Sequence, residues 1–360
     1  MANYRAGIIG TGGVAGLGTI GVDDRDGSRA TASHAGGYDA TESVELVAAA
    51  DVNGETLAAF CDAWDVPPNS RYADHEAMLA AENLDIISVC TPALFHREHV
   101  VDAAEDGVDA ILCEKPIASS LDEATEMIEV CETTDTDLVV NYTLRFTAKF
   151  QHLRKLIRSG EALGDVRSVV VQSRMELGRN ATHVLDLLDY LFEDEMDDIW
   201  GHVTGENESV ETLSARDDVD DAAGRAMLSI GDVQATVDCT TPRRMSSISY
   251  QFLGSAGKLS VNLDDGEWRY WRLEGDEHIP AEMPGIDGAW TWDDDYERGF
   301  ANAITHVRDR LDGSDRTVST AHDAKRSLEA LVAIFVSHYT GSRVSLPLQR
   351  PFEDVEIRSW

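Results

Sequence analysis

The stretch Ala6-Gly7-Ile8-Ile9-Gly10-Thr11-Gly12-Gly13-Val14-Ala15 decides the fold. Its apolar start predicts a buried strand, and the glycines that follow fit the pattern G-x-G-x-x-[G/A]. Gly10 permits a tight turn, and Gly12 lets the backbone approach a pyrophosphate. Ala15 lets the next helix pack closely, with its N-terminal amides toward the phosphates. We therefore expect Gly10, Gly12, Gly13 and Val14 to bind a dinucleotide cofactor.

Strand and helix patterns alternate through the rest of the first 145 residues. Short apolar runs rich in Val, Ile and Ala are separated by amphipathic segments, which implies a parallel sheet covered on both faces. Ser120 and Glu123 form a capping-box pattern at the start of one of these helices. The expected strands are 6–9, 44–50, 85–90, 109–113 and 137–142, and the expected helices are 54–64, 74–82, 96–106 and 120–134.

The pattern changes after residue 145, so we expect a second domain over 146–360. Consecutive strand candidates with turn residues between them predict an open, largely antiparallel sheet. The fold class is therefore α/β, with an N-terminal Rossmann sheet and a C-terminal α/β domain. In the second domain the expected strands are 166–175, 198–205, 223–230, 233–240, 246–253, 257–262 and 267–273, and the expected helices are 147–159, 181–192, 293–312 and 320–340.

Asp51 ends the second strand and is the candidate for choosing the cofactor. A carboxylate there accepts hydrogen bonds from the adenosine ribose and repels a 2′-phosphate, which favours NAD over NADP. Asp51 nevertheless follows Gly10 by about twenty residues more than is typical. We interpret the excess, roughly 18–37, as a loop that either contributes to ligand binding through Ser33 or His34 or is simply exposed to solvent.

The chain has only five lysines, and one of them follows a predicted strand in Cys113-Glu114-Lys115-Pro116. The carboxyl ends of parallel strands form the edge where doubly wound sheets bind ligands. An ammonium group in a desolvated cleft there can hydrogen-bond a substrate hydroxyl. Lys115 is therefore a candidate catalytic residue.

The net charge is −36, with 66 acidic residues spread along the whole chain. An acidic tail would concentrate the charge in one block. Charge that is dispersed along the chain instead favours a protein adapted to molar salt, where the Debye length is about 3 Å. This charge argues against nucleic acid and anionic membranes as partners. No secretory signal or membrane span is recognisable, and the five cysteines have no metal or disulfide spacing. We expect a cytoplasmic protein with reduced, buried thiols and no bound metal.

Together these motifs resemble the Gfo/Idh/MocA oxidoreductases. The resemblance rests on Gly10 to Ala15, Asp51, Thr91-Pro92 with His96, Glu114-Lys115-Pro116, NYTLRF (141–146) and GSAG (254–257), and it spans nearly the whole chain. It implies a nicotinamide cofactor, bordered by Thr91, Pro92 and His96, with Glu114 and Lys115 near the nicotinamide. It also implies Lys115 as the catalytic lysine, a sugar-like substrate and a homo-oligomer, either a dimer or a tetramer.

The same family carries a second motif, D-x-G-x-H-x-x-D, which residues 179–186 match in part. His183 and Asp186 align, whereas Arg179 and Ala181 replace the Asp and the Gly. The i, i+3 spacing places His183 and Asp186 on one helix face, and an imidazole that titrates near neutrality suits a general acid or base. Asn180 and Asp186 are candidates for contacting the substrate, and Arg145 and Arg174 are weaker ones; for Arg174 an ion pair is the favoured role.

These residues predict an NAD(P)-dependent oxidoreductase that transfers a hydride between a nicotinamide cofactor and a secondary alcohol of a sugar, polyol or nucleotide sugar. Two other functions stay open. One is a redox-neutral NAD-dependent glycosidase or lyase, and the other is a non-catalytic regulator that binds NAD and a sugar. A purely structural protein leaves the glycine turn unexplained.

Overall fold

The computed structural model describes residues 3–18, 30–192, 195–204, 218–220, 222–349, 351–352 and 355–358. The chain forms two compact units. The first comprises residues up to Ala118, Glu123–Thr147 and Trp292–Ala324; the second comprises Ser119–Asp122, Ala148–Thr291 and Lys325 onward. The first unit thus runs two residues past position 145 and also takes in a later segment, because the helix Glu297–Leu311 packs against its sheet and helices.

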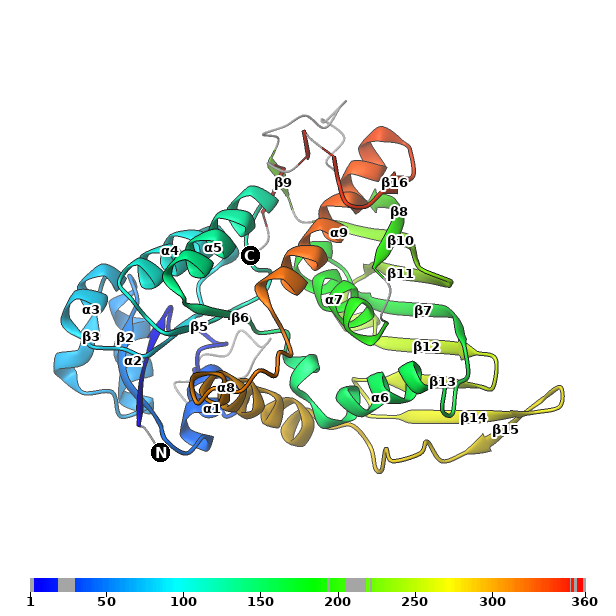
Figure 1. Cartoon of the computed structure of the whole chain (residues 1–360), viewed down its shortest axis with the longest axis horizontal. Helices are drawn as coiled ribbons and strands as arrows, with labels where there is room; N and C mark the ends of the chain where they lie inside the picture. The colour runs from blue at the N-terminus through cyan, green and yellow to red at the C-terminus, as the bar shows by residue number, and fades with distance from the viewer. Residues whose placement is uncertain are drawn as a thin grey trace. The chain divides into compact units, whose positions relative to one another are not determined.

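The first unit is built on a parallel six-stranded sheet with the strand order β3-β2-β1-β4-β5-β6. This is the order of dinucleotide-binding sheets, in which strands are added toward one edge from β1 to β3 and toward the other edge from β4 onward. Figure 1 shows α4 and α5 on one face of the sheet and α1 and α8 on the other. The strands are β1 (Tyr4–Ile9), β2 (Val44–Ala50), β3 (Arg71–Tyr72), β4 (Ile86–Val89), β5 (Ala110–Cys113) and β6 (Asp137–Val140).

The helices of this unit cover a core of Ala, Ile and Val side chains from the central strands, which are almost fully buried. Burial on both faces explains why β4 and β5 are apolar at nearly every position. α5 begins one residue after Ser120, as the capping-box pattern predicts. The helices are α1 (His34–Ala40), α2 (Gly54–Ala63), α3 (His75–Ala81), α4 (His96–Glu105), α5 (Leu121–Thr134) and α8 (Glu297–Leu311).

The first helix does not begin at the glycine turn as the sequence predicted. The Val14 carbonyl accepts a hydrogen bond from the His34 amide, and the Ala15 carbonyl accepts one from the Ala35 amide. In a continuous helix residues 18 and 19 would be the donors, so the partners are displaced by 16 positions. The extra residues are thus an insertion within the first helical turn. Removing 16 from the 41 positions between Gly10 and Asp51 leaves 25, close to the usual spacing of about twenty.

The second unit contains a mixed nine-stranded sheet of order β15-β14-β13-β12-β7-β11-β10-β8-β16. Every neighbouring pair is antiparallel except β7 with β11, which accounts for the largely antiparallel character expected. Its strands are β7 (Val166–Arg174), β8 (Met196–Thr204), β10 (Ala223–Ile230), β11 (Val233–Thr241), β12 (Ser249–Gly254), β13 (Gly257–Asn262), β14 (Trp268–Glu274), β15 (Glu277–Ala281) and β16 (Val344–Ser345).

Burial alternates along β7 and β8, so one face of the nine-stranded sheet is covered and the other is open. Gly201 in β8 allows close packing, because a Cβ there would meet the Ile334 backbone of α9. The remaining helices are α6 (Ala148–Ser159), α7 (Thr182–Leu191) and α9 (Ala321–Thr340). The pair β9 (Asp218–Asp220) and β17 (Glu356–Arg358), like the short β3, β15 and β16, was not expected from the sequence.

No helix in the described ranges combines the length and hydropathy needed to cross a bilayer.

Candidate active site

The glycine turn has the geometry that a dinucleotide diphosphate requires. Gly10 has φ +84°, and a Cβ there would lie 2.8 Å from Thr91 Cγ2, so a larger residue is excluded by both conformation and space. A Cβ on Gly12 would meet nothing within 4 Å. The backbone at Gly12 therefore faces open space at the carboxyl end of β1, beside Gly13 and Val14. These residues fit a bound diphosphate.

Asp51 lies beside this turn at the carboxyl end of β2. Its Oδ2 accepts hydrogen bonds from the Thr11 amide (2.7 Å) and Thr11 Oγ1 (2.8 Å), and its Oδ1 accepts one from the Asn53 amide (2.8 Å). A carboxylate offers about four acceptor positions, so these contacts leave room for one more donor on Oδ1. Asn53 itself caps α2 through its side chain. Asp51 therefore both orders the glycine turn and retains capacity for a ribose hydroxyl.

His96 is buried and braces two loops rather than pointing into solvent. Its Nε2 lies 2.8 Å from the Thr91 carbonyl oxygen, and its Nδ1 lies 3.0 Å from that of Pro116. The loop after β4, which includes exposed Pro92, is thus tied to the loop after β5, where the Lys115–Pro116 peptide is cis. His96 therefore holds these two loops together at the edge of the sheet where the cofactor is expected to bind.

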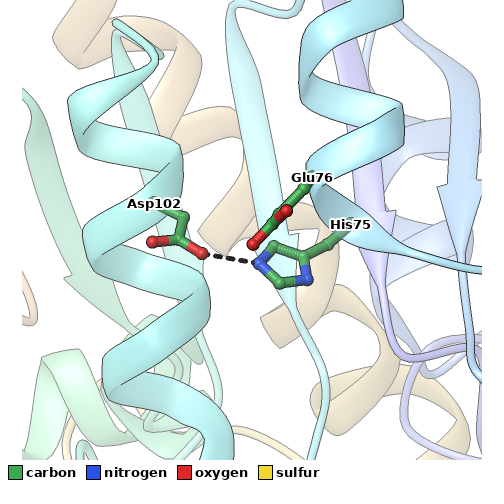
Figure 2. A group of neighbouring side chains, drawn as sticks. All are labelled: His75, Glu76 and Asp102. Carbon is green, nitrogen blue, oxygen red and sulfur yellow. Dashed lines mark hydrogen bonds and ion pairs between the residues drawn. The ribbon is translucent and has the colours of Figure 1, made fainter.

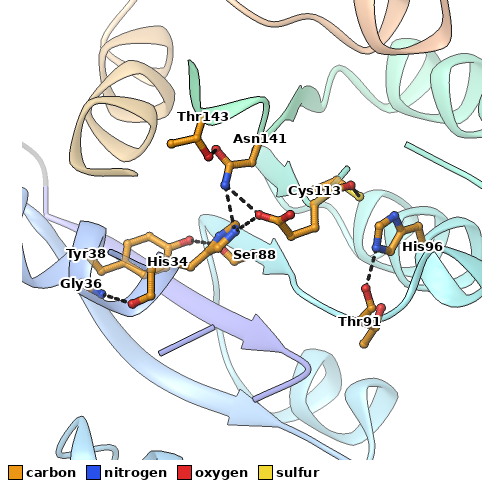
Figure 3. A network of polar contacts seen from close by, with 11 residues as sticks. His34, Gly36, Tyr38, Ser88, Thr91, His96, Cys113, Asn141 and Thr143 are labelled. Carbon is orange, nitrogen blue, oxygen red and sulfur yellow. Dashed lines mark hydrogen bonds and ion pairs between the residues drawn. The ribbon is translucent and has the colours of Figure 1, made fainter. Parts of the chain in front are cut away.

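Glu114 is buried and bonds two residues of a polar network, His34 and Asn141, which Figure 3 labels. Its Oε1 accepts hydrogen bonds from His34 Nε2 (2.9 Å) and Asn141 Nδ2 (2.7 Å). Burial alone would raise the pKa of Glu114. The hydrogen bond and charge of His34, the charge of Lys115 and the amide of Asn141 outweigh it and lower that pKa to about 2. Glu114 is therefore ionised at neutral pH, next to half-buried Lys115.

The sequence pointed to His34 only as a possible ligand contact, and it did not identify Ser88 or Tyr38 at all. Ser33 caps α1 by accepting from the Gly36 amide, and the His34 side chain has no exposed surface. Both therefore face the protein. Two signals were present: a serine within the apolar strand β4, and a histidine at the start of the helix after the insertion. Residues 19–29 of the predicted loop lie outside the described residues.

The second motif lies in the second compact unit, on a strained turn that precedes α7. Glu176 has φ +78°, and residues Leu177–Ala181 form a π-helical turn. Both features are rare and concentrate at functional sites. Half-buried His183 is the second residue of α7, whereas Asp186 is buried and accepts a hydrogen bond from Ser327 Oγ (3.4 Å). The turn was a feature that the sequence did not predict.

The neighbours of His183 differ in what they offer a substrate. Asn180 Nδ2 donates to the Met175 carbonyl oxygen (2.6 Å), which closes the turn. Exposed Arg179 lies 3.8 Å from Glu176, so it replaces the family aspartate with an ion pair at the surface. Asp186 is buried, so it does not lie on the exposed side of the turn. Besides Glu176 and Arg179, the polar side chains of this turn with some solvent exposure are those of half-buried His183 and Asn180.

The two arginines considered for substrate binding are both engaged in ion pairs. Arg145 is buried and lies 3.1 Å from Asp323, and it also donates to the Val318 carbonyl oxygen. This burial makes Arg145 part of the scaffold of the first unit. Arg174 pairs with Asp264 at 2.6 Å, as expected for it.

One cluster of possible metal ligands, His75, Glu76 and Asp102, occurs among the described residues, with the ligand atoms within 4.8 Å of one another. Figure 2 shows His75 facing Asp102 across α3 and α4. His75 Nε2 already bonds Asp102 at 2.8 Å, and Glu76 is exposed. We interpret this cluster as an ion pair between helices. All five cysteines are described; each is buried, and none forms a disulfide.

Comparison with known proteins finds a matching family model for the N-terminal part of the chain. Residues 4–142 match the model GFO_IDH_MocA, described as an oxidoreductase family with an NAD-binding Rossmann fold. A D-apiose dehydrogenase from Paraburkholderia graminis is 27% identical over 85% of this chain and 84% of its own length. A 2,7-anhydro-N-acetylneuraminate hydratase from Mediterraneibacter gnavus is 32% identical over 33% of this chain and 30% of its own length.

The fold extends the similarity to the whole chain. The WlbA dehydrogenase from Bordetella pertussis, solved in complex with NADH and UDP-GlcNAcA, superimposes with a TM-score of 0.72 at 22% identity, covering 96% of this chain and 100% of that one. The strand order, the glycine turn and the Glu114-Lys115-Pro116 segment all lie in the part that matches the family model. Residues 4–142 are therefore similar to the NAD-binding Rossmann domain of the Gfo/Idh/MocA oxidoreductases, and the whole chain shares the fold of the WlbA dehydrogenase.

Proposed function

We propose that this protein is an NAD-dependent oxidoreductase that acts on a secondary alcohol of a sugar, polyol or nucleotide sugar. One observation carries the proposal: the open glycine turn, Asp51 and the Glu114–Lys115 pair lie at the carboxyl ends of β1, β2 and β5, which is one edge of one sheet. Ligands of doubly wound sheets bind at that edge. The sugar-like ligands in the names of the relatives support the substrate class.

Each candidate residue has a distinct part in this reaction. The glycine turn and Asp51 would hold the dinucleotide, which supplies the hydride acceptor when it is bound. The Lys115 ammonium would hydrogen-bond the reacting oxygen and stabilise its developing negative charge. His183 would remove the hydroxyl proton, and Asn180 would orient the substrate. The negative charge of Glu114 would stabilise the Lys115 ammonium in its charged form.

The test of this function is a turnover screen in molar KCl. Sugars, polyols and nucleotide sugars are incubated with NAD and, separately, with NADP, and absorbance at 340 nm is followed. We expect NADH to accumulate with at least one sugar-like alcohol. Turnover with NADP alone would contradict the role given to Asp51.

A redox-neutral lyase or hydratase is the second candidate function. It is favoured by the relative named as a hydratase and by Arg179, which stands where the family motif has an aspartate. Such a route oxidises the substrate transiently and returns the hydride, so no NADH accumulates. Substrate loss by chromatography with flat absorbance at 340 nm would select this candidate.

Replacing Asp51 with alanine should weaken NAD and reduce discrimination against NADP. Loss of a charge-assisted hydrogen bond predicts a rise of about tenfold or more in the Kd for NAD. The Kd for NADP should rise less, because the carboxylate no longer repels the 2′-phosphate. Fluorescence titration of both cofactors measures the ratio. Asp51→Asn, which keeps an oxygen acceptor for Thr11, is the matched control and should preserve the turn while still relaxing the preference.

We also propose that the protein works in a salt-rich cytoplasm, which the charge of −36 and the buried free thiols support. Repulsion among exposed carboxylates is unscreened in dilute buffer, so the Tm should rise steeply between about 0.05 M and 2 M KCl. Scanning calorimetry across this range measures the effect, with equal osmolarity of sucrose as the control. Equal Tm values in dilute and molar salt would contradict the proposal.

A homo-oligomer is part of the same proposal. The open face of the nine-stranded sheet exposes apolar side chains that neighbour one another, among them Trp200 opposite Met227. Val170 in β7 and Leu253 in β12 are also 43% and 41% exposed. Apolar residues gathered on one open sheet face are typical of surfaces that bind protein.

A further inference from the structure

The histidine that restarts the first helix contacts the residue next to the candidate catalytic lysine. His34 is fully buried, with Nε2 at 2.9 Å from Glu114 Oε1 and Nδ1 at 2.9 Å from Ser88 Oγ. Ionised Glu114 can only accept hydrogen bonds, so Nε2 of His34 carries the proton and donates it. The insertion thus delivers one imidazole, from the start of α1, to the carboxyl end of β5 (Figure 3).

The other side of the imidazole ends in the protein interior. Ser88 Oγ lies 2.7 Å from the Tyr38 hydroxyl, and both residues are buried. These hydrogen bonds end at buried Tyr38, so among the described residues they form no path by which a proton could reach solvent. His34 is therefore placed to hold a carboxylate rather than to exchange protons with water.

Holding that carboxylate has a consequence for Lys115. A buried carboxylate without donors would take up a proton, because burial penalises its charge. Two donors, His34 and Asn141, converge on the same oxygen of Glu114. We propose that His34 is a positioning residue that fixes Glu114 as an oriented anion, and that Glu114 in turn keeps the Lys115 ammonium charged at the carboxyl end of β5.

The other titratable groups around Glu114 leave this role to His34. The thiols of Cys90 and Cys113 have a pKa raised by burial and by Glu114, and burial together with Glu114 raises the pKa of Tyr296 to about 12, so all three are neutral at neutral pH. Burial lowers the pKa of His96, which bonds only backbone carbonyls. Among the described residues, the titratable groups that interact electrostatically with Glu114 are His34, Lys115, Cys90, His96, Cys113 and Tyr296.

The test measures the reactivity of Lys115 in the protein without cofactor or substrate, so it does not depend on the proposed reaction. Trace acylation at about pH 8, read by mass spectrometry, reports the uncharged amine, and the four other lysines serve as internal standards. Glu114→Gln should accelerate Lys115 acylation about tenfold, as expected for loss of one close opposite charge. His34→Phe should accelerate it at least about threefold, and His34→Gln, which keeps a donor, should return it toward wild type.

Two comparisons decide the outcome. The double variant His34→Phe/Glu114→Gln should acylate no faster than Glu114→Gln alone, because His34 acts through Glu114. Tyr38→Phe and His306→Phe, which alter a distal hydroxyl and an unrelated buried histidine, should leave Lys115 unchanged. Wild-type reactivity in His34→Phe, an unchanged rate in Glu114→Gln, or equal acceleration in the two control variants would overturn the proposal.

A kinetic readout applies where the enzyme turns over, and this part rests on the proposed function. His34→Phe should add a second loss of kcat at acid pH, below the limb assigned to His183, because Glu114 then gains a proton about 1 to 3 pH units higher than in the wild type. If His34→Phe does not fold, Ser88→Ala, which removes the hydroxyl that contacts both His34 Nδ1 and Tyr38, replaces it and should give a smaller acceleration of the same sign. A failed substrate screen would leave the acylation result intact.

Discussion

Lys115→Met should lower kcat about a thousandfold while leaving the Kd for NAD within about threefold of wild type. Removing one preorganised donor to a developing oxyanion costs two to three orders of magnitude in comparable sites. Methionine preserves the length and volume of the side chain but not the charge. Steady-state rates at 340 nm and cofactor titration by fluorescence separate the two effects.

The structure supplies matched controls for this variant. Lys155 is exposed on α6, so Lys155→Met should retain wild-type turnover. Lys115→Arg keeps a positive charge with a different donor geometry, and it should also be strongly impaired. Full turnover in Lys115→Met with NAD still bound would remove the lysine from the chemistry. Such a result would favour a protein that binds NAD and a sugar to regulate another process.

His183→Asn should lower kcat by about two to four orders of magnitude, with little change in the Kd for NAD. General acid–base catalysis contributes an effect of this size, and asparagine keeps a polar side chain without an exchangeable proton near neutrality. The pH dependence of kcat between about pH 5 and 8 should also disappear, since an imidazole titrates in that range.

The control for His183 is another histidine of the second unit. His278 lies exposed on β15, so His278→Asn should behave as wild type. If His183→Asn loses activity in proportion to its loss of Tm, the effect belongs to the helix start and not to proton transfer. Retained pH dependence in a weakened variant would assign the base to another group.

Much of the fold followed from local chemistry that the sequence carries by itself. The glycine turn after an apolar strand, the alternation of strand and helix, and the change of pattern after residue 145 predicted both sheets and their character. These signals are local, because Gly10 needs a positive φ and buried strands need apolar residues at consecutive positions. Short strands such as β3 and β16, with two residues each, gave no pattern long enough to detect.

Some residues of the candidate site could likewise be predicted from local sequence, whereas others could not. Gly10, Asp51 and Lys115 could be selected because each follows directly from a strand end, and parallel strands bring their ends together. His34 could not be assigned, because its role depends on an insertion within a helical turn that lets the Val14 carbonyl accept from the His34 amide. The ion pair of Arg145 could not be predicted either, since its partner Asp323 lies 178 positions away (323 − 145).

By itself, then, the sequence determined that the glycine turn, Asp51 and Lys115 follow strand ends at one edge of one sheet, because strand ends and glycine turns are set by neighbouring residues. Only the tertiary structure decided which side chains hold that lysine's neighbour ionised. Burial and hydrogen-bond partners depend on contacts between α1 and the ends of β4, β5 and β6, which the chain brings together from positions 27 to 80 residues apart.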